Sequence, residues 1–141
     1  MDSQLTSNSY PWSRTDAGRS ESRRPRQSND CTVRALATAR QITYDAAYDV
    51  LKDAGRSSGR RFRMQDWLDL QPWAEKISFP AVKGKPRMNV AAFVHQYPQG
   101  IFIVRVAKHV FAVRDGVVFD DSHNRPDRCV YTAWKIVAGK S

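Results

Sequence analysis

The sequence predicts an α+β fold in which helices come first and an antiparallel sheet, formed by the C-terminal half, follows. Two observations carry this prediction. Before Gly100, apolar residues recur at helical spacing between polar cap-forming positions, whereas after Gly100 they stand in dense runs of strand length. The 141 residues suffice for one domain with a core of modest size.

The first 28 residues carry few side chains that a core could use, and we expect residues 1–28 to form a flexible polar and basic tail. Four arginines gather between Arg19 and Arg26. The apolar cluster Tyr10-Pro11-Trp12 is suited to pin this tail to the domain or to a partner. The folded domain is then expected over residues 29–141.

The first helix is predicted where the polar run ending in Asn29 and Asp30 meets the alanine-rich stretch from Thr32 to Arg40. Either Asn29 or Asp30 can serve as its N-cap, which places Cys31 in the first turn. The positive end of the helix dipole and the free backbone amides there favour the thiolate over the thiol. The alternative is that Cys31 is a buried packing residue.

Three more helices follow from caps and spacing. We expect them at residues 44–54, capped by Thr43 and ended by Gly55, at residues 64–70, and from Asn89 to the residue before Pro98. Four strands follow in the second half, and we expect them at residues 101–106, 109–114, 117–121 and 129–137.

The turn between the second and third of these strands determines which carboxylate can contact His109. Asp115-Gly116 is the sequence preferred by a two-residue type I′ hairpin. With those turn residues, His109 and Asp120 lie on one side of the hairpin as diagonal neighbours, whereas Asp121 points to the other side. Asp120 is therefore the expected partner of His109.

Cys31, His109 and Asp120 supply a nucleophile, a base and a group that orients the base. This order, with the cysteine on the first core helix and the other two on a sheet, resembles small papain-like cysteine peptidases of the bacteriocin-processing and phage-encoded kinds. The resemblance covers the chain from residue 29 onward. It departs from the family at Thr32, where a glycine often follows the nucleophile.

The resemblance also implies an oxyanion-hole glutamine upstream of the cysteine. Gln27 is the first candidate and Asn29 the second, although Gln27 precedes Cys31 by four positions rather than the usual six or so. Either side chain can instead be a loop or capping residue.

The resemblance implies a thiol hydrolase, a peptidase or isopeptidase that cleaves an amide or thioester bond in a protein or peptide substrate without a cofactor. The same three residues also serve transglutaminase-like and acyl-transfer chemistry. The competing hypothesis is a phage-encoded or accessory binding protein with an inactive triad. It would engage nucleic acid or a host protein through arginine-rich loops.

The basic composition motivates that second hypothesis. The net charge is +9, the sequence pI is about 10.0, and the densest basic patch is the loop that holds Arg56, Arg60, Arg61 and Arg63. Such a loop can bind nucleic acid or another anionic partner, and the alternative is a solvated loop without a ligand.

A third hypothesis is a metal site made by Asp120, Asp121, His123 and Cys129. Their spacing matches no established zinc pattern, so we expect no metal. The two cysteines, Cys31 and Cys129, give no disulfide framework of the secreted type. Without an apolar signal region or a run long enough to cross a membrane, the sequence favours a cytoplasmic protein.

Overall fold

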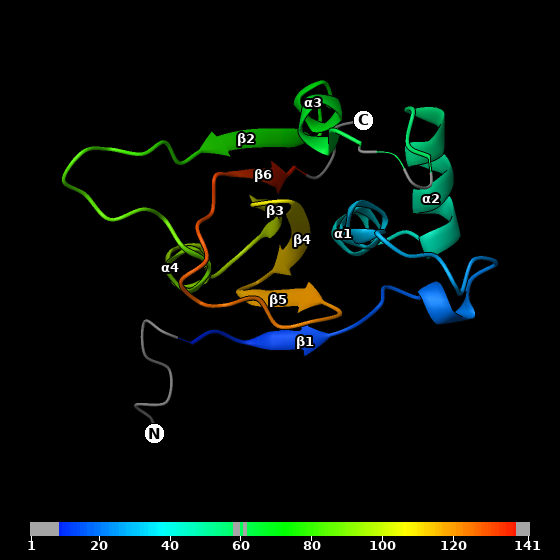
Figure 1. Ribbon diagram of the computed structural model, residues 1–141, viewed down its shortest axis with the longest axis horizontal. Helices are drawn as coiled ribbons and strands as arrows, with labels where there is room; N and C mark the ends of the chain where they lie inside the picture. The colour runs from blue at the N-terminus through cyan, green and yellow to red at the C-terminus, as the bar shows by residue number, and fades with distance from the viewer. Residues whose placement is uncertain (1–8, 58–59, 61, 138–141) are drawn as a thin grey trace.

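The computed structural model describes residues 9–57, 60 and 62–137. Within them, four α-helices surround a mixed six-stranded sheet of order β1-β5-β4-β3-β6-β2 (Figure 1). The strands are β1 (Trp12–Arg14), β2 (Ala74–Ser78), β3 (Ile101–Val106), β4 (His109–Arg114), β5 (Val117–Asp120) and β6 (Thr132–Ile136). The helices are α1 (Cys31–Arg40), α2 (Tyr44–Asp53), α3 (Met64–Asp69) and α4 (Val90–Gln96), with a short 3₁₀ turn at Arg19–Glu21. The α+β class expected from the sequence is confirmed.

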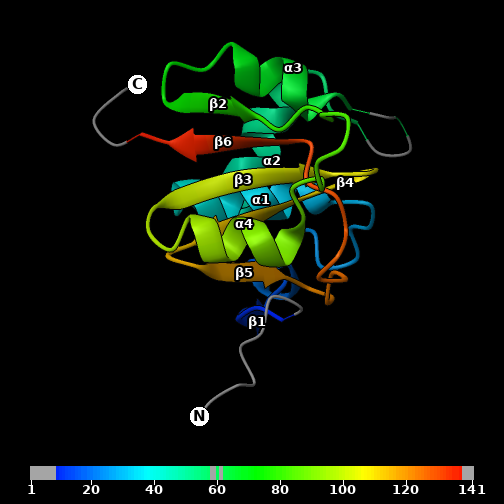
Figure 2. The ribbon, with the colours of Figure 1, turned by 90° about the vertical axis from the view of Figure 1, so that its left-hand side faces the viewer.

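Helices cover both faces of the sheet. Helix α1 lies against one face with α2 packed on its outer side, and α4 covers the opposite face (Figures 1 and 2). On the α1 face, Leu36 packs in one core cluster with Ile103 and Trp134. On the α4 face, Phe93 and Phe102 pack edge to face with ring centroids 5.2 Å apart. Each face therefore has its own apolar core.

Two of the predicted helix caps are present. The Thr43 hydroxyl accepts a hydrogen bond from the Ala46 backbone N–H at 3.1 Å, and the Asn89 side chain accepts one from Ala92 at 2.8 Å. Helix α1 differs. Asp30 occupies the N-cap position of α1, but its carboxylate makes no capping hydrogen bond.

The hairpin of β4 and β5 has the predicted register, with Arg114 opposite Val117 and Ala112 opposite Phe119. The turn residues Asp115 and Gly116 have φ angles of 49° and 77°. Two positive φ angles in a two-residue turn are the geometry of type I′. The expectation for this turn is therefore confirmed.

The sheet is not purely antiparallel, which corrects the prediction. Strand β1 pairs in parallel with β5, with Trp12 opposite Val118 and Arg14 opposite Asp120. The described part of the expected tail thus lies on the domain, and Tyr10 is only 8% exposed. A strand of three residues is too short to show a period in the sequence. Its pairing partner, β5, lies more than 100 residues away in the chain, so neighbouring residues gave no sign of it either. Residues 1–8 of that tail lie outside the described residues.

Strand β2 is a second contribution from the part of the chain before Gly100. It pairs antiparallel with β6 from Ala74 opposite Ile136 to Ser78 opposite Thr132. The last predicted strand, residues 129–137, is accordingly shorter, and Cys129 makes only an isolated bridge with Asn89.

Candidate active site

Cys31 is the first residue of α1, at the end of the sheet where β4 begins. Its half-buried sulfur accepts hydrogen bonds from the His109 imidazole and from the Val110 backbone N–H. The first N–H groups of a helix have no acceptor within the helix, so the sulfur also lies at the positive end of α1. The structure thus places the predicted nucleophile beside the predicted base.

His109 opens β4, and 17% of its side chain is exposed. Its Nε2 atom lies 2.6 Å from Asp120 Oδ2. With Nε2 engaged by the carboxylate, Nδ1 is the ring nitrogen left to share a proton with the sulfur. One side chain therefore links the thiol to the acid.

Asp120 is the last residue of β5, and its side chain is fully buried. Besides His109, its carboxylate accepts hydrogen bonds from Arg34 Nη1 at 2.7 Å and from Asn124 Nδ2 at 2.9 Å. The backbone N–H of Asp121 donates to Oδ1 at 2.9 Å. These bonds offset the cost of burying a carboxylate and fix its orientation.

The three side chains shift one another's pKa values. Burial raises the pKa of a thiol, but the bonds from His109 and Val110 outweigh it, so that the pKa of Cys31 lies below its ordinary value. Burial lowers the pKa of an imidazole, but the bonds to Asp120 and Cys31 raise the pKa of His109 to about 9. Both shifts favour a thiolate beside an imidazolium at neutral pH.

A buried ionic network behind the site was not predicted from the sequence. Asp30 accepts from Arg34 Nε at 3.0 Å, from the Tyr44 hydroxyl at 2.8 Å and from Arg19 Nη1 at 3.0 Å. Arg34 therefore bridges Asp30, which precedes Cys31, and Asp120, which contacts His109. The i, i+4 spacing of Asp30 and Arg34 was the only signal in the sequence.

The oxyanion candidates lie on the loop that enters α1. The Gln27 side-chain amide donates to the Ser28 carbonyl at 3.3 Å. Asn29 has a φ of 50°, and its carbonyl accepts from Arg56 Nη2 at 3.1 Å. The free N–H groups of the first turn of α1 are additional donors for an oxyanion.

The four arginines expected to form a basic loop fall into different environments. Arg56 is only 6% exposed, and its Nε donates to the Thr32 hydroxyl at 3.2 Å, so it braces the start of α1 instead of joining a solvated loop. Arg63 pairs with Asp66 at 2.7 Å, and Arg60 is exposed. Arg61 lies outside the described residues.

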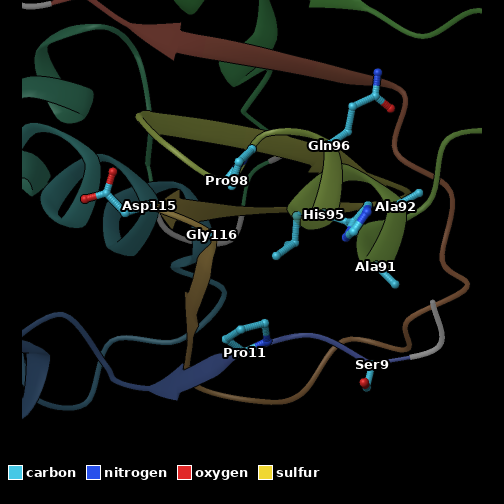
Figure 3. Close-up of a pocket in the computed structure, with 10 residues that line it drawn as sticks. Ser9, Pro11, Ala91, Ala92, His95, Gln96, Pro98, Asp115 and Gly116 are labelled. Atoms are coloured by element: carbon cyan, nitrogen blue, oxygen red, sulfur yellow. The ribbon is translucent and has the colours of Figure 1, made fainter. Parts of the chain in front are cut away.

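Two pockets differ in their relation to the triad. A pocket of about 190 Å³ is lined by His109 and Val110 together with Arg63, Gln65, Arg105 and Lys108. A larger one, of about 730 Å³, lies between α4 and residues 9–11 and includes none of the predicted site residues (Figure 3). The smaller pocket therefore lies next to His109, whereas the larger pocket does not.

The candidate metal ligands are not assembled into a site. Within residues 9–57, 60 and 62–137, no group of three His, Cys, Asp or Glu side chains could hold a metal ion. Asp120 is occupied by the contacts above, and the His123 ring stacks on Tyr10 with centroids 4.9 Å apart.

Comparison of the chain with protein-family models, curated proteins and solved structures gives no match. In the described part of the chain, no helix has both the length and the apolar character needed to cross a membrane.

Proposed function

We propose that this protein is a thiol hydrolase of papain-like type that cleaves an amide or thioester bond with Cys31, His109 and Asp120. The observation that supports it is the continuous hydrogen-bonded chain from the Cys31 sulfur through His109 to the buried Asp120 carboxylate. A packing cysteine needs none of these partners. A low thiol pKa beside a base is the arrangement that nucleophilic catalysis requires.

The reaction follows from the roles of these groups. The Cys31 thiolate attacks the carbonyl carbon of the substrate, and a C–S bond forms while the carbonyl oxygen takes the negative charge. His109 gives its proton to the leaving nitrogen or sulfur, the scissile bond breaks, and an acyl-enzyme remains. His109 then takes a proton from water, which attacks the acyl carbon and releases the acid and the thiolate. Asp120 holds the imidazole in the orientation that both transfers need.

The alternative proposal is a binding protein that uses its arginines on nucleic acid or a host protein. It rests on the net charge of +9 and on exposed cations such as Arg60. The Arg56 side chain donates hydrogen bonds to Thr32 and Asn29 at the start of α1. This weakens the case for the arginine-rich loop as a binding surface. We therefore favour the enzyme.

The test compares the two cysteines in the native protein. Iodoacetamide should label Cys31 at neutral pH at least about tenfold faster than Cys129, because a lowered pKa raises the thiolate fraction. His109→Ala should remove most of this difference. Cys31→Ala should abolish hydrolysis of a fluorogenic peptide or isopeptide library, whereas Cys129→Ala should retain it.

Equal and slow labelling of both cysteines would refute the enzyme proposal. Salt-sensitive retention on an oligonucleotide that is lost in Arg60→Ser/Arg63→Ser, together with an unreactive Cys31, would support the binding protein instead.

A further inference from the structure

The small pocket beside the triad has a consistent charge. Three of its lining residues, Arg63, Arg105 and Lys108, are cations, and no Asp or Glu of the described residues lines it. They come from separate elements: Arg63 precedes α3, Arg105 lies on β3 and Lys108 is in the turn between β3 and β4. The fold therefore gathers positive charge at one place.

This pocket is continuous with the nucleophile's surroundings. Its walls include His109 and Val110, and these same two residues bind the Cys31 sulfur. A substrate that presents a carbonyl to Cys31 must therefore pass close to the pocket. At about 190 Å³, the pocket has room for one small side chain or chain end.

Two of the cations lack an acidic partner among the described residues. Arg63 is paired with Asp66, but neither Arg105 nor Lys108 forms an ion pair there. The guanidinium of the half-buried Arg105 is centred 5.5 Å from the Tyr131 ring, which holds it in place. A cation that is partly buried without an acid is suited to an anion brought by a ligand.

We propose that this pocket binds a carboxylate of the substrate, through Arg105 and Lys108 with Arg63 at its rim. The inference rests on the proposed function and deepens it, because it makes the substrate of Cys31 an acidic peptide. The carboxylate belongs either to an Asp or Glu side chain near the scissile bond or to the C-terminus of the substrate. A nucleic acid fits less well, because the lining offers no aromatic ring other than His109 on which a base could stack.

The experiment uses two alkylating reagents that differ in charge. The rate of Cys31 modification by anionic iodoacetate is divided by the rate with neutral iodoacetamide, so that changes in thiol reactivity cancel. Arg105→Gln/Lys108→Gln should lower this ratio about fivefold at low ionic strength, since both removed charges line the pocket whose walls also include His109 and Val110, the two partners of the sulfur. The ratio of the wild type should fall with added salt.

Three controls isolate the pocket. Lys83→Gln/Lys85→Gln removes two exposed cations from another loop and should leave the ratio unchanged. Arg105→Lys keeps the charge and should also keep the ratio. The single variant Lys108→Gln changes an exposed side chain, so it gives a lower ratio even if the double variant fails to fold.

A peptide library separates the two carboxylate sources. Peptides with Glu or Gln at each position around the scissile bond, each made with a free or amidated C-terminus, are tested as substrates and as protectors of Cys31. Preference for Glu identifies a side chain, and preference for the free end identifies a C-terminus.

The inference is overturned if the ratio is the same in the wild type and Arg105→Gln/Lys108→Gln, or if Lys83→Gln/Lys85→Gln changes it equally. It is also overturned if an oligonucleotide protects Cys31 and acidic peptides do not. Slow labelling of Cys31 by iodoacetamide would refute the hydrolase, while the ratio would still report the charge of the pocket. The two failures are therefore distinguishable.

Discussion

Arg34 Nη1 lies 2.7 Å from Asp120 Oδ1, although the two residues are 86 positions apart in the chain. The contact joins α1, which begins at Cys31, to β5, which ends at Asp120. The same guanidinium also donates a hydrogen bond to Asp30, the residue that precedes Cys31. The relative positions of the thiol and the acid therefore depend on one buried arginine.

Removing this arginine should be costly. Arg34→Met takes one of two cationic partners from each of two buried carboxylates, since Asp30 keeps Arg19 and Asp120 keeps His109, and breaking a buried pair in this way costs about 3–5 kcal/mol. Urea unfolding should show a loss of that size. Arg40→Met in the same helix removes only a cation over the Trp73 ring and should cost about 1 kcal/mol or less. Equal losses in the two variants would contradict the role given to Arg34.

The neighbouring carboxylates should differ sharply in activity. Asp120→Asn removes the charge that faces His109 at 2.6 Å and should lower hydrolysis by about a hundredfold or more. The side chain of Asp121 is 34% exposed, and its Oδ1 lies 3.4 Å from Arg34 Nη1. Asp121→Asn should therefore lower the rate of hydrolysis by no more than about fivefold. The two kcat/KM values, measured on one peptide, check this ranking. A larger loss in Asp121→Asn would mean that the acid of the triad has been misassigned.

The pH dependence should separate alkylation from hydrolysis. Both reactions need the Cys31 thiolate. Because the pKa of Cys31 is lowered, both rates should rise over a pH range that lies below the ordinary pKa of a thiol. Hydrolysis also needs a protonated His109, and since its pKa is raised to about 9, hydrolysis should fall as pH rises through that value. Alkylation needs only the thiolate and should not fall there.

Asp120→Asn supplies the control for that assignment. The hydrogen bond and the charge of Asp120 raise the pKa of His109, so their loss should move the alkaline limb of hydrolysis to lower pH. An alkaline limb that stays in place would show that another group titrates there.

Local patterns predicted the elements better than they predicted the site's surroundings. Thr43, Asn89 and the pair Asp115-Gly116 act through neighbours in sequence, and their caps and turn are as expected. The hairpin register in turn selected Asp120 over Asp121 as the partner of His109, and the structure places Asp120 there. Polar contacts between distant segments, such as Tyr10 with Asn124, repeat with no period and left no signal.

The last prediction concerns that contact. The Tyr10 hydroxyl donates to the Asn124 carbonyl at 2.5 Å and accepts from the Asn124 backbone N–H at 3.0 Å. The Asn124 side chain in turn donates to Asp120 Oδ2, so a residue expected in a flexible tail supports the acid of the proposed triad.

Tyr10→Phe keeps the ring but leaves two buried backbone groups of Asn124 without their partner, since Asn124 is only 4% exposed. The free energy of unfolding should fall by about 1–3 kcal/mol. Hydrolysis should fall through kcat, because Asp120 is held less firmly, and Ser13→Ala on the adjacent half-exposed strand should leave both quantities near the wild-type values. If Tyr10→Phe lowered stability without any change in kcat, the N-terminal segment would support the fold and not the orientation of Asp120.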